Sequence, residues 1–181
     1  YEEMTNVPFI IAGPGIHPRQ KPVEDLLTQP TIDLLPTLCE LAGIPVPSSK
    51  PGISLAPFLK GEKQKRQHPY AASEWHSEYE VTVSPGRMIR SPRYKYTHYL
   101  EGNGEELYDM LKDKGERRNL AHDPKYSKIL AEHRALLDDY IRRTQDDYRS
   151  LKVEADKRWR SHAPGYPNHE GPCARDIINR K

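Results

Sequence analysis

The sequence is poor in cysteine, phenylalanine and long apolar segments. Its 181 residues include two cysteines and two phenylalanines, against eleven tyrosines. One possible pair, Cys39 with Cys173, makes no disulfide framework, so cysteine usage does not define a redox compartment. No apolar run approaches the roughly 20 residues that a membrane-spanning helix needs. The tyrosines suit half-buried positions, where the ring is covered and the hydroxyl finds a polar partner.

A strong charge of one sign is also missing. The formal net charge is +2, so no overall field favours nucleic acid or an acidic membrane. The densest basic run, residues 60–66, is interpreted as a solvated loop in preference to an anion-binding patch. Near the C-terminus, His162, His169 and Cys173 have a spacing that fits no standard zinc pattern. Composition therefore indicates a globular chain and identifies no ligand.

The first third of the chain predicts one strand and one helix. Residues 7–12 form a short apolar run closed by Gly13 and Gly15, as in a strand buried on both faces of a parallel sheet. Such a strand is not stable alone, so its sheet partners must lie elsewhere. Asp33 is the predicted N-cap of a helix that ends before Gly43. The predicted apolar side of this helix consists of Leu34, Leu35, Leu38, Cys39, Leu41 and Ala42.

From Tyr70 the sequence period changes to that of β-strands. Residues 71–75, 87–90 and 94–100 are short and rich in aromatic or branched side chains, and apolar and polar positions alternate in the last of them. This pattern predicts an antiparallel sheet with one covered face. Residues 107–108 are expected to add a short strand or a turn.

A long helix is predicted after Asp123, a capping residue that is followed by Pro124 at the first helical position. Apolar side chains recur at helical spacing over residues 126–141, so we expect this helix to pack across the sheet. His133 falls on the apolar side and is predicted to be a packed histidine. Beyond about Tyr148 the pattern ends in an irregular tail.

A series of short motifs occurs in a fixed order along the chain. They are Tyr-Glu-Glu and Val-Pro within residues 1–8, Pro-Gly at 14–15, Asp-Leu-Leu-Pro-Thr at 33–37, Gly-Ile-Ser-Leu at 52–55, two arginine-rich strands within 87–96, Glu-Leu-Tyr-Asp at 106–109 and Asn-Leu-Ala at 119–121. In this order they resemble the C-terminal portion of the type I, formylglycine-dependent sulfatases. Residues 80–82 resemble, more weakly, the heparan N-sulfatase (N-sulfoglucosamine sulfohydrolase) branch.

The resemblance implies an α/β, alkaline-phosphatase-like fold, of which this chain would be the C-terminal portion. Residues 1–66 would end the main α/β domain with one strand and one helix of the main sheet. Residues 67–148 would form a small antiparallel sheet packed by a long helix, and residues 149–181 an irregular tail. The remainder of the sulfatase domain would then be a partner of this chain.

The same resemblance implies that the parent enzyme is a sulfuric ester hydrolase with formylglycine and calcium. Formylglycine attacks sulfur, and calcium stabilises charge on the sulfate oxygens. No cysteine or serine here begins the family's Cys/Ser-x-Pro-x-Arg motif. The family's metal-binding aspartates and sulfate-binding lysine lie before its Tyr-Glu-Glu segment. We therefore expect this chain alone to be inactive and to bind neither cofactor.

What the chain could add is a wall of the substrate pocket. Residues 74–82 combine carboxylates, a histidine and aromatic side chains, a mixture that suits a sugar. We predict His76, Glu80 and Arg90 as substrate contacts, none of them a nucleophile, and a sulfated carbohydrate such as a glycosaminoglycan as the substrate. The competing interpretations are a loop histidine, a solvated carboxylate and a structural arginine pair.

Two other functions stay open. The parent protein could be a phosphodiesterase or phosphonate hydrolase of the same superfamily, because fold does not fix chemistry. The chain could instead be a non-catalytic binding module, although an apolar strand at residues 7–12 without sheet partners would invite aggregation. The sequence assigns no location; a periplasmic, secreted or lysosomal one would fit the family.

Overall fold

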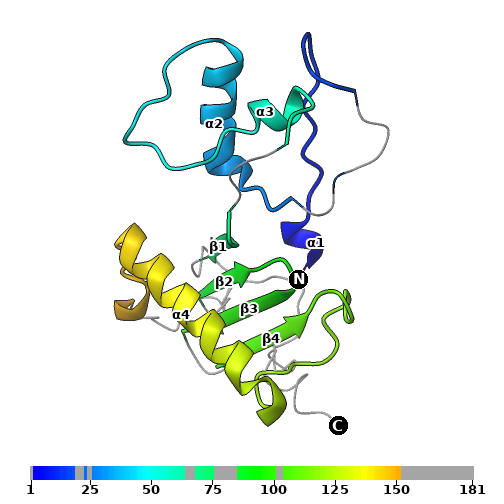
Figure 1. Cartoon of the computed structure of the whole chain (residues 1–181). Helices are drawn as coiled ribbons and strands as arrows, with labels where there is room; N and C mark the ends of the chain where they lie inside the picture. Colours follow the sequence, from blue (N-terminus) through cyan, green and yellow to red (C-terminus); the bar gives the residue numbers. More distant parts are fainter. Residues whose placement is uncertain are drawn as a thin grey trace, which may run out of the picture.

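The chain folds into a helical part and a sheet part. The computed structural model describes residues 2–18, 23, 26–63, 68–75, 85–100 and 104–151. Its elements are α1 (Glu2–Thr5), α2 (Pro30–Leu41), α3 (Ala56–Leu59), β1 (Ala71–Trp75), β2 (Gly86–Arg90), β3 (Tyr94–Tyr99), β4 (Glu105–Asp109), η1 (Pro124–Tyr126), α4 (Ser127–Thr144) and η2 (Tyr148–Ser150). Figure 1 shows α2 and α3 at one end of the molecule and the sheet with α4 at the other.

The strands form an antiparallel sheet in the order β1-β2-β3-β4, so each strand pairs with its neighbours in sequence. The register places Ile89 opposite Tyr96 and Tyr96 opposite Leu107. Large side chains of three strands therefore share one face of the sheet. The predicted strands are confirmed to within about one residue at their ends, and residues 107–108 lie inside β4.

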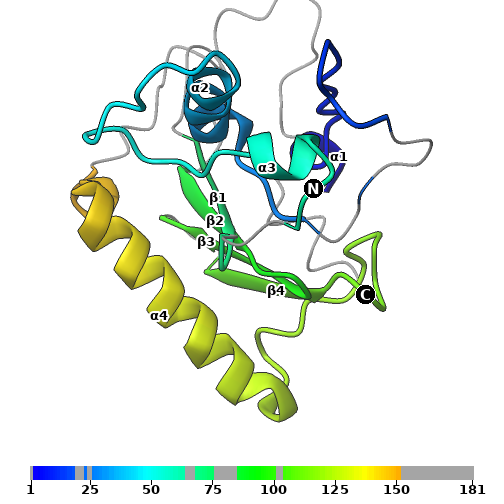
Figure 2. The same ribbon diagram turned by 45° about the horizontal axis from the view of Figure 1, so that its top comes forward.

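Helix α4 covers this face of the sheet, as Figures 1 and 2 show. The Asp123 side chain accepts a hydrogen bond from the backbone N–H of Lys125 at 3.1 Å and caps the short turn η1, from which α4 continues. The helix ends where Gln145 adopts a left-handed φ of 56°. The shared core consists of Tyr70, Ile89, Tyr96, Leu107, Leu120, Leu130 and Leu137. The predicted long helix and its packing across the sheet are confirmed.

The opposite face of the sheet is also covered, contrary to the prediction of one covered face. Lys95 and Thr97, which alternate with the core tyrosines of β3, are 3% and 4% exposed. The Lys95 ammonium group lies 2.7 Å from a carboxylate oxygen of Glu116 and 3.5 Å from one of Glu2. Polar side chains on a strand therefore do not identify a solvent-facing side when ion pairs satisfy them.

Helix α2 begins three residues earlier than its predicted N-cap, at Pro30. The prediction of Asp33 as the N-cap is wrong, because this residue lies inside the first turn and is fully buried. Its carboxylate reaches back to accept the backbone N–H of Gln29 at 2.7 Å. The predicted C-terminus is confirmed. Gly43 has a φ of 69°, and the Ile44 N–H donates to the Cys39 carbonyl at 2.8 Å, as in a Schellman motif.

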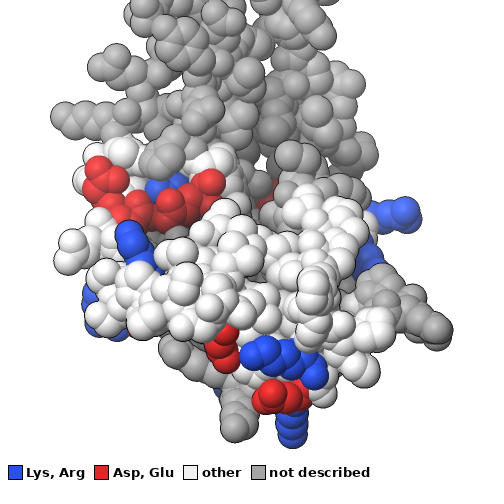
Figure 3. Space-filling model, turned by 90° about the horizontal axis from the view of Figure 1, so that it is seen from above, with Lys and Arg blue, Asp and Glu red and all other residues white. Residues whose placement is uncertain are grey.

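The predicted apolar side of α2 faces solvent in this structure. Leu34, Leu35 and Leu38 are 41%, 44% and 51% exposed. Residues 7–12 form no strand, and Ile10 is 85% exposed. A strand needs a neighbour to satisfy its backbone groups, and no other strand of the described residues pairs with this segment. Figure 3, which looks down from above Figure 1, shows a broad uncharged surface with charged side chains toward its margins.

None of the helices in the part of the chain that the structure covers combines the length and the apolar character needed to span a bilayer.

Candidate functional site

Two of the three predicted pocket residues belong to the connection between β1 and β2. His76 and Glu80 both lie within 76–84, outside the described residues. The structure does describe the two residues that flank this segment, Trp75 at the end of β1 and Pro85 just before β2. The structure therefore describes the base of the predicted site, by which we mean the end of the β1–β2 pair where Trp75 and Pro85 lie.

The indole of Trp75 packs against the start of β2. A Cβ atom on Gly86 would overlap the Trp75 ring, so only glycine fits opposite Trp75 in this register. The Tyr99 ring meets the indole edge to face, with ring centroids 5.8 Å apart. Trp75 thus covers Gly86 at the base of the site and is itself fixed by Tyr99.

A buried arginine lies beside this base. Arg87 is 1% exposed, and its Nε and Nη2 donate to the two carboxylate oxygens of Asp146 at 2.6 Å and 2.9 Å. Burial alone would lower the pKa of Arg87, but the hydrogen bonds and charge of Asp146 outweigh it and raise the pKa. The guanidinium group therefore stays charged, with a bidentate partner that satisfies it.

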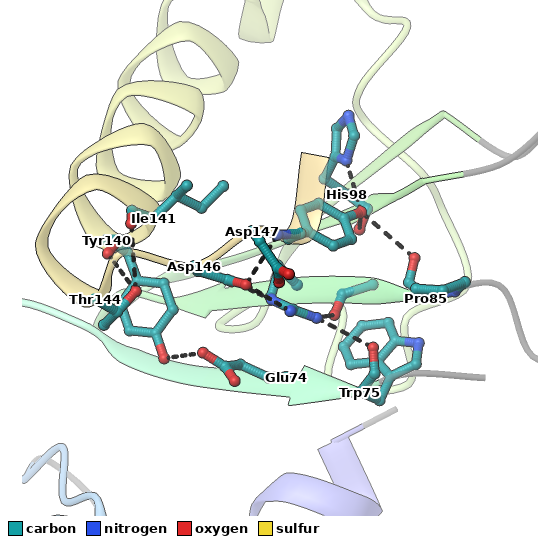
Figure 4. Close-up of polar contacts among 12 residues, drawn as sticks. Glu74, Trp75, Pro85, His98, Tyr140, Ile141, Thr144, Asp146 and Asp147 are labelled. Carbon is teal, nitrogen blue, oxygen red and sulfur yellow. Dashed lines mark hydrogen bonds and ion pairs between the residues drawn. The ribbon is translucent and has the colours of Figure 1, made fainter. Parts of the chain in front are cut away.

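Tyr148 and His98 complete the cluster, and Figure 4 shows His98 near Asp146, Trp75 and Pro85. The Tyr148 ring lies under the Arg87 guanidinium group, 4.4 Å from ring centroid to Cζ. Its hydroxyl donates to the His98 carbonyl at 2.8 Å and lies 2.9 Å from His98 Nδ1. Burial raises the pKa of Tyr148 to about 12 and lowers the pKa of His98, so both groups are neutral at pH 7.

Glu74, which precedes Trp75, turns toward helix α4. The Tyr140 hydroxyl donates to a carboxylate oxygen of Glu74 at 2.6 Å. Burial and this hydrogen bond to a carboxylate raise the pKa of Tyr140. Glu74 is therefore a structural partner of α4 and is not directed at a ligand.

Arg90 lies at the other end of β2. It pairs with Ala71, whereas Gly86 pairs with Trp75 at the base of the site, and four residues along a strand span about 13 Å. The Arg90 Nε lies 3.4 Å from a carboxylate oxygen of Glu2. Arg90 therefore does not lie next to Trp75 or Pro85, the residues that flank 76–84. Its ion pair with Glu2 agrees with the competing interpretation, a structural arginine pair.

Asp146 and Tyr148 were missed by sequence reasoning. Tyr148 is the last residue before the predicted irregular tail, and in the structure it is fully buried and begins the short turn η2. The only available signal was an aromatic residue shortly after the helix, which is weak. Their partner Arg87 lies 59 residues from Asp146 in sequence, a separation that periodicity does not bridge.

The described residues do not fit the cofactors that the resemblance implies. Within these ranges, no three His, Cys, Asp or Glu side chains come together in a way that could hold a metal ion. Cys39 is a free thiol on α2, and Glu40-Leu41-Ala42 follow it where a formylglycine motif would need proline and arginine. No chemical step can therefore be assigned to the residues that the structure describes.

A small antiparallel sheet packed by one long helix, preceded by a helical segment, is the architecture of a C-terminal sulfatase domain. Residues 1–143 match the family model described as N-sulphoglucosamine sulphohydrolase, C-terminal. The chain belongs to this family.

Individual proteins agree with this assignment. The chain is 76% identical over 181 residues to a Delta 4,5-hexuronate-2-O-sulfatase of Bacteroides thetaiotaomicron, covering 100% of this chain and 38% of that protein. A solved 2-O GAG sulfatase is also 76% identical, with a TM-score of 0.78 over 92% of this chain and 36% of that one. A phosphonate monoester hydrolase from Silicibacter pomeroyi is 25% identical, with a TM-score of 0.53 over 68% of this chain and 27% of that one. The chain thus spans well under half the length of each of these proteins.

Proposed function

We propose that this chain is the C-terminal part of a sulfatase that removes sulfate from a glycosaminoglycan or a related sulfated carbohydrate. The observation that carries the proposal is the 76% identity, along the whole chain, to a hexuronate-2-O-sulfatase. Sulfate esters are the first candidate, and an N-sulfate is the second because the matching family model is named after an N-sulfoglucosamine hydrolase. The parent enzyme would carry formylglycine and calcium on residues outside this chain.

Within that enzyme, this chain supplies one wall of the substrate pocket. His76 and Glu80 follow directly from the rigid base built by Trp75, Gly86 and Arg87, so they are the primary proposed contacts. The mixture of carboxylates, histidine and aromatic groups in residues 74–82 suits sugar hydroxyls and the apolar face of a ring. Arg90 is the third proposed contact. Because Arg90 pairs with Glu2, a substrate sulfate would have to compete with the Glu2 carboxylate for the guanidinium group.

The test uses a full-length enzyme that contains this chain. We expect His76→Ala and Glu80→Gln each to lower kcat/KM for a 2-O-sulfated unsaturated disaccharide about tenfold or more, because polar groups of the substrate then lose their partners. Hydrolysis of a small aryl sulfate should stay within about twofold, since it reports the sulfate-cleaving centre alone. Lys63→Ala, at an exposed position outside residues 74–82, is the control.

Unchanged kinetics in the His76 and Glu80 variants on every sulfated sugar tried would reject the substrate role. Arg90→Gln separates the two interpretations of that residue. A raised KM with an unchanged free energy of unfolding supports contact with the substrate. A lowered free energy of unfolding with an unchanged KM supports the pair with Glu2.

Phosphonate monoester hydrolysis is the second candidate activity, because a phosphonate monoester hydrolase shares this fold. The two activities are separated by assaying the same full-length protein on phenylphosphonate monoesters and on sulfated disaccharides. Preference for the phosphonate by kcat/KM would replace the sulfatase proposal. A non-catalytic binding module is disfavoured by the exposed leucines of α2, and a sharp cooperative melt of the soluble 181-residue chain would restore it.

A further inference from the structure

One buried side chain bonds both strands at the point where they leave the sheet. Nη1 of Arg87 donates to the carbonyl of Trp75, the last residue of β1, at 3.1 Å. It also donates to the carbonyl of Gly86, the first residue of β2, at 2.9 Å. Arg87 therefore ties together the backbone on either side of residues 76–84.

The guanidinium group has its orientation set by the segment that follows helix α4. Asp146 engages it in a bidentate pair, and the backbone N–H of Tyr148 donates to Asp146 Oδ1 at 3.0 Å, which fixes that carboxylate. The Tyr148 ring covers one face of the guanidinium group. A planar fork held on two sides has little freedom to rotate.

Tyr148 also reaches the second flank directly. Its hydroxyl oxygen lies 3.4 Å from the carbonyl of Pro85, in addition to its shorter hydrogen bond to the His98 carbonyl. Tyr148 is fully buried and Asp146 is 9% exposed at its side chain. Buried groups of this kind hold backbone in place and do not meet a ligand.

We propose that Asp146 and Tyr148 are positioning residues which, through Arg87, fix Trp75, Pro85 and Gly86 and so set the carbohydrate affinity of the enzyme. The inference rests on the proposed function, in which residues 76–84 contact the substrate. Contact geometry is sensitive to small shifts in the supporting structure, and a misplacement of about 1 Å can cost a factor of about 100. The segment after α4 thus has a functional role that its position in the chain does not suggest.

The experiment compares Asp146→Asn and Tyr148→Phe in a full-length enzyme that contains this chain. Asparagine keeps the shape of Asp146 but presents an N–H₂ group to the guanidinium fork, and phenylalanine keeps the ring of Tyr148 without its hydroxyl. We expect each variant to raise KM for a 2-O-sulfated unsaturated disaccharide about tenfold. The kcat on that substrate and the kcat/KM on a small aryl sulfate should change by less than about twofold.

Two matched controls make the same chemical changes elsewhere on the sheet-and-helix unit. Asp139→Asn weakens an exposed ion pair with Arg143 on α4, and Tyr94→Phe alters a ring of β3 at the end of the sheet away from Trp75. Both control variants should leave the KM and kcat for the disaccharide and the kcat/KM for the aryl sulfate unchanged. Equal KM values for Asp146→Asn, Tyr148→Phe and the controls would overturn the proposal, and so would an equal loss on the disaccharide and the aryl sulfate.

The outcome also separates this inference from the function on which it rests. If His76→Ala and Glu80→Gln reduce carbohydrate hydrolysis while Asp146→Asn and Tyr148→Phe do not, the positioning role alone fails. If all four variants leave carbohydrate hydrolysis unchanged, the proposed pocket wall fails as well. Should Tyr148→Phe not fold, the Asp146→Asn result decides the matter.

Discussion

Asp33 is a buried carboxylate with partners from three segments of the chain. It accepts the backbone N–H of Gln29 at 2.7 Å and that of Ile53 at 2.8 Å, and it lies 2.7 Å from Nε2 of His68. The neighbouring Thr37 hydroxyl accepts the N–H of Leu55 at 2.9 Å. Two polar side chains on α2 therefore hold the loop that leads into α3.

We predict that Asp33→Asn lowers the free energy of unfolding by about 1–3 kcal/mol, because the amide leaves one buried N–H group without an acceptor. Urea unfolding of the full-length protein measures this. Glu40→Gln, at an exposed position of the same helix, should change stability by less than about 0.5 kcal/mol. Equal effects of the two substitutions would show that the carboxylate contributes nothing specific.

His133 is the residue through which pH should act on the core. It is 4% exposed, and its Nδ1 and Nε2 lie 2.8 Å from the Ile129 carbonyl and 2.9 Å from the Ser91 hydroxyl. Burial lowers the pKa of His133, and burial does the same for His98. The folded protein therefore binds these protons less readily than the unfolded chain, whose histidines titrate near 6.5.

We therefore predict that the free energy of unfolding decreases as pH falls from 7 through 6.5 and below, because protonation then favours the unfolded chain. Glu106 acts in the opposite direction, since burial raises its pKa. His133→Gln isolates the contribution of His133. The slope of stability against pH between about 7 and 5.5 should be shallower in the variant, and identical slopes would contradict the prediction.

Arg87 shows why the base of the site could be predicted only in part. Its position in a strand followed from the sequence. Its partner did not, because Asp146 lies beyond the C-terminus of α4 and meets Arg87 only once the helix has crossed the sheet. The same reasoning applies to Tyr148, whose burial depends on tertiary packing and not on any local period.

At the scale of elements, local signals predicted most of the structure. The helix after Asp123 has a capping residue, a proline at the first position and an apolar side, so every signal agrees. Helix α2 lacks a capping side chain at Gln29, so the local pattern favours Asp33 as the N-cap. A strand at residues 7–12 requires partners from elsewhere, and its apolar composition alone cannot supply them.

The end of α2 provides a clean test at this scale. Gly43 has a φ of 69°, and a Cβ atom added there would meet nothing within 4 Å, so Gly43→Ala changes only backbone strain. We predict a loss of about 1–2 kcal/mol in the free energy of unfolding. Gly13 is equally open but has no positive φ, so Gly13→Ala should be neutral or slightly stabilising. Similar losses for both glycines would contradict the Schellman assignment.

At the scale of the whole molecule, the exposed apolar side chains form the feature that most needs a partner. Leu34, Leu35 and Leu38 of α2 are 41–51% exposed, and Ile10 is 85% exposed. Exposed apolar side chains that lie close together, like the three leucines of α2, mark a contact site on a protein surface. The relative with 76% identity is much longer than this chain, which covers 38% of it. The remainder of the sulfatase domain is therefore the proposed partner of this surface.

This proposal predicts opposite effects of one substitution in two contexts. In the isolated 181-residue chain, Leu38→Lys should reduce binding of a hydrophobic dye and increase solubility, because the leucine faces water. In the full-length enzyme it should lower the free energy of unfolding by about 1.5–3 kcal/mol, the value of a buried leucine. Leu111, which is 67% exposed in the sheet part, provides the control, since Leu111→Lys should change full-length stability little. An unchanged stability of the full-length Leu38→Lys variant would mean that α2 remains solvated in the complete enzyme, and the remainder of the sulfatase domain would then have to contact this chain through another surface.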